Sequence, residues 1–178
     1  SDAAIDEDGV YVLELSGSDV DGDQLSFFGS SDGNSSISID GSTLTVTPTA
    51  DFNGDIELTV SVSDGLSSDS TTFTLTVNAV NDAPVISDLP NQTIDEDSFL
   101  TVSLSASDVD GDTLTFSADN GEADIVIDGT TLTVTPPENY NGSDTVTVTV
   151  TDGDLSDSTT FTLTVNPVND APSLAALS

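Results

Sequence analysis

The sequence contains no lysine, arginine or histidine, while 33 of its 178 residues are acidic, giving a formal net charge of −33. Because there is no basic side chain, no salt bridge between side chains can form within this chain. Two carboxylates about 4–5 Å apart repel by roughly 3–4 kcal/mol at an effective dielectric constant near 20, so clustered acids need a cation from solution. The same charge disfavours nucleic acid and anionic membrane surfaces as partners.

Cysteine and tryptophan are also absent, and aromatic residues make up only 5% of the chain. The lack of cysteine excludes disulfides and does not indicate a compartment. Without cysteine or histidine, the common arrangements of nucleophile and base cannot form, which argues against an enzyme. Sugar-binding surfaces commonly use exposed aromatic side chains, so the composition also argues against a carbohydrate-binding role. No apolar run reaches the length needed to insert into a membrane.

What the chain does contain is aspartate, with 27 aspartates against 6 glutamates. A merely solubilising acidic surface could use either residue. Tight cation-binding loops favour the short aspartate side chain in turns. This bias therefore favours cation binding over solubility alone.

The tetrapeptide Asn-Asp-Ala-Pro at 81–84 returns 88 positions later, at 169–172. Other segments repeat with a step of 88 or 89, namely the acidic turns at 5–8 and 94–97, those at 19–23 and 108–112, and the identical octapeptides at 71–78 and 159–166. Repetition at a fixed period indicates a repeat architecture. We therefore expect domains at residues 1–80 and 81–168, with 81–84 as their joint, and residues 169–178 as the joint and first strand of a following repeat.

Apolar and polar residues alternate in short runs in both repeats, at 56–62, 73–77, 146–150 and 161–165. A period of two is typical of strands with one buried face. Six or seven such strands per repeat, separated by turn signals, predict an all-β protein of two seven-stranded β-sandwich domains. Residues 1–9 show no obvious strand. Residues 29–35 are expected to form a loop that absorbs the one-residue change in repeat spacing.

The two repeats begin differently. Residues 85–90 are expected to form the first strand of the second domain, whereas the first domain starts after the equivalent position and lacks that strand. The tail, residues 173–178, corresponds to the same strand of a following repeat. We therefore expect that the tail of one molecule can complete the first domain of another, a head-to-tail self-association by β-strand addition.

Together, the acidic turns, the Phe-Asn-Gly and Asp-Gly turns and the Val-Asn-Asp-Ala-Pro joint resemble the bacterial cadherin-like repeats (VNDAP type) of large surface adhesins. The resemblance implies cadherin-like or Ig-like sandwiches joined end to end, with calcium (Ca2+) at each joint and neighbouring repeats as partners. It implies the calcium-rigidified extender domains of a secreted, cell-surface adhesin involved in cell adhesion. The alternative is a cadherin-like carbohydrate-binding module of a polysaccharide-degrading system.

The resemblance also implies the calcium ligands, since this ion takes six to eight oxygen ligands from carboxylates, carbonyls and water. At the central joint they would be Glu7, Asp8, Asp55 (or Asp51 in its place), Asn81, Asp82, Asp108, Asp110 and Asp152. At the N-terminal pole they would be Asp19, Asp21 and Asp64, and at the C-terminal pole Glu96, Asp97, Asn169 and Asp170. Each acidic motif alone could be only a polar turn, and the Asp-x-Asp-Gly-Asp turns are not EF-hand loops, because Gln24 and Thr113 stand where glycine is required.

Overall fold

The computed structural model describes residues 2–172 and 174, and it assigns sixteen strands and no helix to this part of the chain. The predicted all-β class is therefore confirmed. The described residues hold no helix of the length and apolarity that crossing a membrane requires. The chain divides into two compact units, residues 1–80 (unit 1) and residues 81–178 (unit 2).

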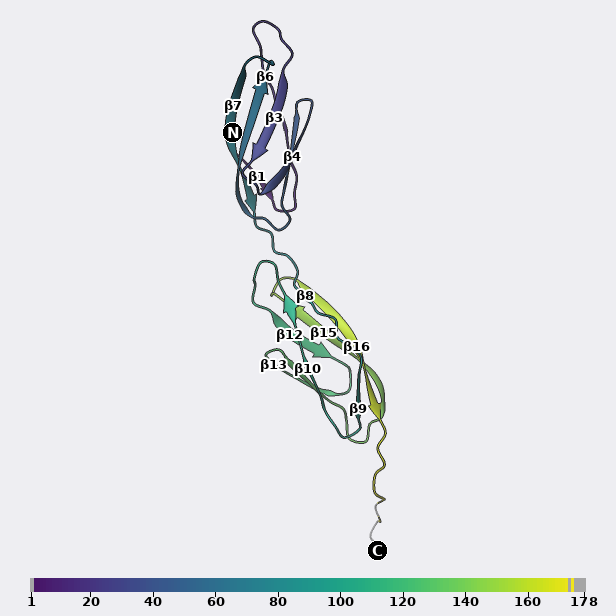
Figure 1. Ribbon diagram of the computed structural model, residues 1–178. Coiled ribbons are helices and arrows are strands. Elements are labelled where there is room, and N and C mark those ends of the chain that lie inside the picture. Colours follow the sequence, from purple (N-terminus) through teal and green to yellow (C-terminus); the bar gives the residue numbers. More distant parts are fainter. Residues whose placement is uncertain (1, 173, 175–178) are drawn as a thin grey trace. The chain divides into compact units, whose positions relative to one another are not determined.

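Unit 1 contains seven strands in two sheets, and Figure 1 shows β7, β6 and β3 side by side. One sheet has the order β1-β7-β6-β3 and the other β2-β5-β4. The bounds are β1 Ala3–Asp6, β2 Tyr11–Glu14, β3 Ser26–Ser31, β4 Ser35–Asp40, β5 Thr43–Pro48, β6 Gly54–Ser63 and β7 Ser68–Asn78. Both sheets contribute to one core, in which Leu44 of β5 joins Ile56 of β6 and Leu75 of β7. Unit 1 is therefore a β-sandwich.

Unit 2 contains nine strands around a single core to which Leu132, Val148 and Leu163 contribute. Its sheets have the orders β9-β16-β15-β12 and β10-β14-β13, and a short third pair joins β8 to β11. The bounds are β8 Val85–Ile86, β9 Gln92–Asp95, β10 Leu100–Ser103, β11 Ala106–Ser107, β12 Thr115–Asp119, β13 Asp124–Asp128, β14 Thr131–Thr135, β15 Gly142–Thr151 and β16 Ser156–Asn166. The pair formed by β8 and β11 is thus added to the same seven-stranded plan.

Strand alternation and register are repeated from one unit to the other. In unit 1 Gly54 of β6 lies opposite Val77 of β7, and in unit 2 Gly142 of β15 lies opposite Val165 of β16, 88 positions later in both strands. Successive side chains of a strand point to opposite faces, so most apolar residues of these hairpins are buried and most threonines lie on the opposite face. The duplicated sequence therefore produces a duplicated core.

Two local expectations were wrong. Residues 1–9 include β1, which pairs in parallel with β7 from Ala3 opposite Leu75 to Asp6 opposite Asn78. The loop expected at residues 29–35 covers only 32–34, because Gly29, Ser30 and Ser31 continue the pairing of β3 with β6. β3 and β4 are each one residue longer than their counterparts β12 and β13, whereas the loop at 32–34 is one residue shorter than the loop at 120–123. The extra residue of unit 1 therefore lies in its strands and not in the loop.

The two units differ at β8, which pairs antiparallel with β11 in unit 2. In unit 1 the residues equivalent to β11, Gly17 and Ser18, belong to no strand. The tail strand expected at residues 173–178 lies outside the described residues, except for Leu174.

Candidate metal centre

Each unit buries one glutamate next to the end of its last long strand. Glu7 is 6% exposed and Glu96 is 7% exposed, and they are the buried charged residues of the described chain. Oε1 of Glu7 accepts a hydrogen bond of 2.5 Å from the backbone N–H of Val80, and Oε1 of Glu96 accepts one of 2.5 Å from Val168. A buried carboxylate is costly unless it has hydrogen bonds and a compensating charge. This chain has no basic side chain, so no side chain of the protein can supply that charge.

Beside each glutamate lies an aspartate with a left-handed backbone. Asp8 and Asp51 in unit 1 have φ of 59° and 56°, and Asp97 and Asn139 in unit 2 have 61° and 56°. Asp8 Oδ1 accepts a hydrogen bond of 3.4 Å from Asp51 N, and Asp97 Oδ1 accepts one of 3.0 Å from Asn139 N. Aspartate and asparagine tolerate this conformation better than other side chains, and such outliers concentrate at functional sites.

Of the two alternatives for the loop ligand of unit 1, Asp51 has the better position. Its carboxylate lies within 4.8 Å of that of Asp8. Asp55 lies in β6 instead, and its Oδ1 accepts a hydrogen bond of 2.8 Å from the Thr76 hydroxyl of the neighbouring strand. Asp55 is therefore tied to the sheet face, and Asp51 is the stronger candidate.

The acidic turn at 108–112 of unit 2 gathers three carboxylates, those of Asp108, Asp110 and Asp112, within 4.8 Å of one another. Oδ1 of Asp108 accepts a hydrogen bond of 3.2 Å from Asp112 N. Oδ2 of Asp108 is buried and has no hydrogen-bond partner among the described residues. Buried polar atoms are nearly always satisfied, so this oxygen is a candidate ligand atom for a bound cation. Asp112 was missed as a candidate, although it is the third acid of the repeated Asp-x-Asp-Gly-Asp turn.

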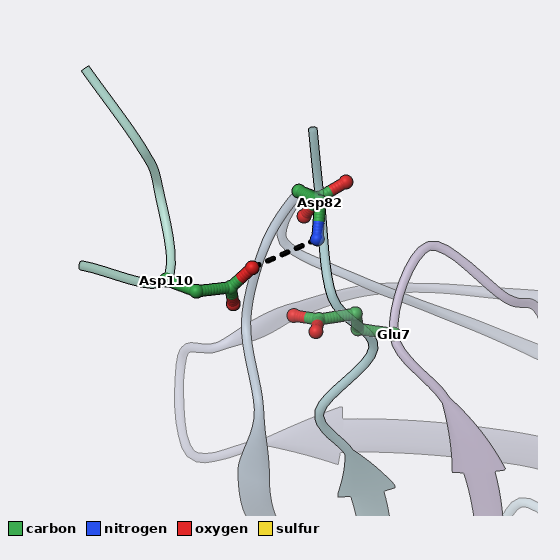
Figure 2. A group of neighbouring side chains, drawn as sticks. All are labelled: Glu7, Asp82 and Asp110. Carbon is green, nitrogen blue, oxygen red and sulfur yellow. Dashed lines mark hydrogen bonds between the residues drawn. The ribbon is translucent and has the colours of Figure 1, made fainter. Parts of the chain in front are cut away.

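Residues of the joint are bonded to the acidic turns of unit 2. The backbone N–H of Asp82 donates to Oδ2 of Asp110 at 2.8 Å, as Figure 2 shows. The Asn81 amide donates to Oδ2 of Asp152 at 2.9 Å. This bond, followed by the backbone N–H of Leu155, holds the pKa of Asp152 below its ordinary value of 3.8. These two bonds and the cluster of Asp108 with Asp110 therefore bring together the five ligands that are expected from unit 2 at the central joint.

The acids expected at the N-terminal pole are arranged as self-bonded turns. Asp19 Oδ1 accepts from Asp21 N at 2.8 Å, and Asp64 Oδ1 accepts from the backbone N–H groups of Leu66 and Ser67 at 2.7 and 2.6 Å. These amides, Ser67 first, lower the pKa of Asp64 below 3.8. The described residues show no group of three carboxylates within 4.8 Å at this pole.

The acids expected at the C-terminal pole repeat the arrangement of unit 1. Glu96 and Asp97 make the contacts described above, equivalent to those of Glu7 and Asp8. Asn169 donates from its side chain to the Asp170 carbonyl at 3.0 Å, as Asn81 does to the Asp82 carbonyl at 3.4 Å. The two joint sequences therefore share this hydrogen bond from the asparagine side chain to the next carbonyl.

Chemically, this donor set fits a hard divalent cation. It consists of carboxylate oxygens and amide groups in a chain without thiol or imidazole ligands, and calcium prefers oxygen ligands of this kind. The acidic clusters could hold a metal ion, whereas no nucleophile and base pair of cysteine or histidine is possible.

The fold and the acidic turns define a class, the tandem sandwich domains of Ig-like and cadherin-like proteins. Residues 1–78 match the family model of the cadherin-like domain, and residues 81–166 match that of the bacterial Ig domain. Domains of these families are typically non-catalytic, cadherin-like domains commonly bind calcium, and bacterial Ig-like domains are typical of extracellular surface proteins. The narrower VNDAP type stays a prediction.

Several solved structures are similar to this chain. The first two domains of human protocadherin-24 align with 90% of this chain and 88% of that one, at 16% identity and a TM-score of 0.49. Four domains of Drosophila N-cadherin align with 80% of this chain and 41% of that one, at 14% identity and a TM-score of 0.42.

An endo-fucoidan hydrolase of glycoside hydrolase family 107 aligns with 94% of this chain, at 23% identity and a TM-score of 0.41. The chain spans 27% of the length of that hydrolase. At these identities the similarity concerns the fold alone. No curated protein matches the chain.

Proposed function

We propose that this protein is a pair of extender domains of a secreted bacterial surface adhesin, and that calcium bound at the joints stiffens the array. The observation that carries the proposal is the turn of Asp108, Asp110 and Asp112. Its three carboxylates lie within 4.8 Å of one another, and one of their oxygens is buried without a partner among the described residues. With no basic residue in the chain, a cation is the group that can neutralise this turn.

In this proposal the ligands of a joint come from both of the domains that it connects. The first unit contributes Glu7, Asp8 and Asp51. The second contributes the joint residues Asn81 and Asp82 together with the acidic turns of Asp108, Asp110 and Asp152. The linker at 81–84 is short and contains a proline, which fixes one backbone dihedral. Calcium shared between the two sides would then restrict the remaining freedom of the linker.

The recurrence of the same contacts around Glu96 and Asp97 supports a function that is repeated along an array. A joint at 169–172 would be built from the same residue types as the joint at 81–84. Ions that bind only the folded state stabilise it by mass action, so the stability of the array would follow the calcium concentration outside the cell.

The test is small-angle scattering with a parallel calorimetric melt of the whole chain, in calcium and then in a chelator. We expect calcium to raise the melting temperature and to narrow the distribution of interdomain distances. The variant Asp108→Asn with Asp110→Asn should lose most of both effects. The control Asp40→Asn with Asp128→Asn removes the same charge from exposed hairpin turns and should keep both effects.

Identical scattering and melting in calcium and chelator would contradict the proposal. Binding to polysaccharides on a glycan array, without any effect of calcium on shape, would favour the carbohydrate-binding alternative.

A further inference from the structure

Among the described strand pairs, β1 with β7 and β9 with β16 are parallel, and all the others are antiparallel. In unit 2, β9 lies beside the end of β16, with Gln92 opposite Leu163 and Asp95 opposite Asn166 (Figure 1). The chain reaches β9 soon after the joint at 81–84, and it leaves unit 2 from the end of β16. This pair therefore connects the segment that enters unit 2 to the segment that leaves it.

Tension along the chain loads this pair in shear. A pull on the joint at 81–84 draws β9 by its N-terminal end, and a pull on residues 169–172 draws β16 by its C-terminal end. Because the two strands are parallel, these pulls act in opposite directions along one axis, and the bonds between the strands are loaded together. An antiparallel pair pulled in the same way would instead open from one end, one bond after another.

The strand β8 precedes β9 on this path but is held by a shorter contact. It pairs with β11 over two residues, whereas β9 pairs with β16 over four. The contact between β9 and β16 is therefore the larger resistance to tension in unit 2.

Side chains lengthen this contact at both ends. Ahead of β9, Oδ1 of Asn91 accepts the backbone N–H of Thr162 at 2.8 Å. Behind β9, the N–H of Glu96 donates to the Asn166 carbonyl at 2.9 Å, and Oε1 of Glu96 accepts the N–H of Val168. The two side-chain oxygens thus take the place of backbone carbonyls, and the bonded segment of unit 2 extends from 91 to 96.

Unit 1 repeats these bonds, although one of the residues differs. Oδ1 of Asp2, the equivalent of Asn91, accepts the N–H of Thr74 at 3.3 Å. The N–H of Glu7 donates to the Asn78 carbonyl at 2.9 Å, as that of Glu96 does in unit 2. Because aspartate replaces asparagine here, the shared feature is the Oδ1 acceptor.

Packing also opposes sliding of one strand past the other. Ile94 of β9 packs against the core to which Leu163 and Val165 of β16 belong. A slip of one residue would turn Ile94 away from the core, because the side chains of a strand alternate between its faces. The pair therefore resists shear through the core as well as through hydrogen bonds.

We propose that this parallel pair is a tension clamp, defined as β9 and β16 with the side chains of Asn91 and Glu96, and that unit 1 has its own in β1 and β7. The clamp gives each unit a second function, to carry load along the chain without unfolding. The proposal rests on the extender function for the source of the tension. It does not rest on calcium, so it can be tested in chelator.

The first experiment pulls unit 2 of the whole chain in two directions, with optical tweezers and in chelator. The chain has no cysteine, so two cysteine substitutions give two defined attachment points. Ser87→Cys with Ala171→Cys loads the clamp in shear, and Ser98→Cys with Ala171→Cys opens it from the end at Asp95 and Asn166. All three positions are exposed. We expect the unfolding force to be at least about twofold higher in shear, because opening from one end breaks the weak bonds singly.

The second experiment removes one side-chain bond. Asn91→Ala should lower the shear force by roughly a fifth, the share of one bond among those loaded together. It should leave the force of the second geometry unchanged, because that opening starts at the other end of β9. Asn91→Asp keeps the Oδ1 acceptor, as Asp2 does in unit 1, and should retain the shear force. The control Thr160→Ala, an exposed change in β16 outside the paired residues, should change neither force.

Equal unfolding forces in the two geometries would overturn the proposal. Equal losses of force in both geometries for Asn91→Ala would show that Asn91 affects only the general stability of unit 2, and would remove it from the clamp. A twofold difference in chelator, together with no effect of calcium on scattering, would support the clamp while contradicting the calcium-dependent extender.

Discussion

Asn81, the first residue of the joint, donates its side-chain amide to Asp152 at 2.9 Å. The equivalent acid of unit 1, Asp64, lies in the same kind of turn and accepts backbone N–H groups in the same way, and no amide side chain donates to it among the described residues. Comparing the two aspartates therefore measures how the Asn81 side chain changes the pKa of an acidic turn.

We predict that Asn81→Ala raises the pKa of Asp152 towards 3.8, because the first cause of its depression is lost. A depressed pKa stabilises the folded state above the unfolded value, and that contribution disappears as the pH falls through the folded pKa. The variant should therefore lose less stability than the parent chain on acidification below about pH 4. Carboxyl-carbon NMR titration measures the shift directly.

Asp64 is the internal control, and its pKa should not move in the same titration. An unchanged Asp152 in the Asn81→Ala variant would show that the hydrogen bond does not form in solution.

A second prediction distinguishes the effect of the Asp97 backbone conformation on stability from the effect of its carboxylate. Asp97→Gly and Asp97→Ala both remove the acceptor of the Asn139 N–H, but in chelator the alanine variant should be less stable than the glycine variant by about 1–2 kcal/mol, because glycine adopts a φ of 61° at little cost. Both variants should lose the same part of any calcium-dependent stabilisation. Thermal melts in calcium and in chelator measure these effects. Full calcium stabilisation in the glycine variant would remove Asp97 from the ligand set.

A third prediction concerns Asp108, whose Oδ2 is buried without a partner among the described residues. Asp108→Asn should raise the melting temperature of unit 2 in chelator, because it removes one of three neighbouring negative charges and keeps the Oδ1 acceptor. In calcium the same substitution should lower the melting temperature of unit 2 below that of the parent chain. Asp128→Asn, an exposed change of equal charge in the same unit, should show no such reversal.

A fourth prediction is that the two cores melt separately. Leu44 and Leu132 occupy equivalent, fully buried positions in units 1 and 2. Each Leu→Ala substitution should lower the free energy of unfolding of its own unit by roughly 2–5 kcal/mol. In calorimetry with chelator, Leu132→Ala should lower the midpoint temperature of the unit 2 transition and leave that of unit 1 unchanged. Leu44→Ala should lower the midpoint temperature of the unit 1 transition only. The exposed control Val126→Ala should change neither by more than about 0.5 kcal/mol.

The sequence by itself determined the all-β fold and the repeated strand pattern. The alternation along β6, β7, β15 and β16 is a local property, since neighbouring side chains of a strand point to opposite faces whatever the strand pairs with. The acidic turns were equally visible, because each is a run of adjacent residues recurring at nearly one period.

The tertiary structure alone decided which of these residues meet. β1 was not recognisable, because Ala3–Asp6 is short and is held by parallel pairing with residues 72 positions away. The choice of Asp51 over Asp55 depends on the left-handed backbone that brings Asp51 to Asp8, which no spacing in the sequence predicts. Local patterns specify strands and turns, whereas clusters and grooves arise where distant segments pack, and their geometry depends on all of those segments together.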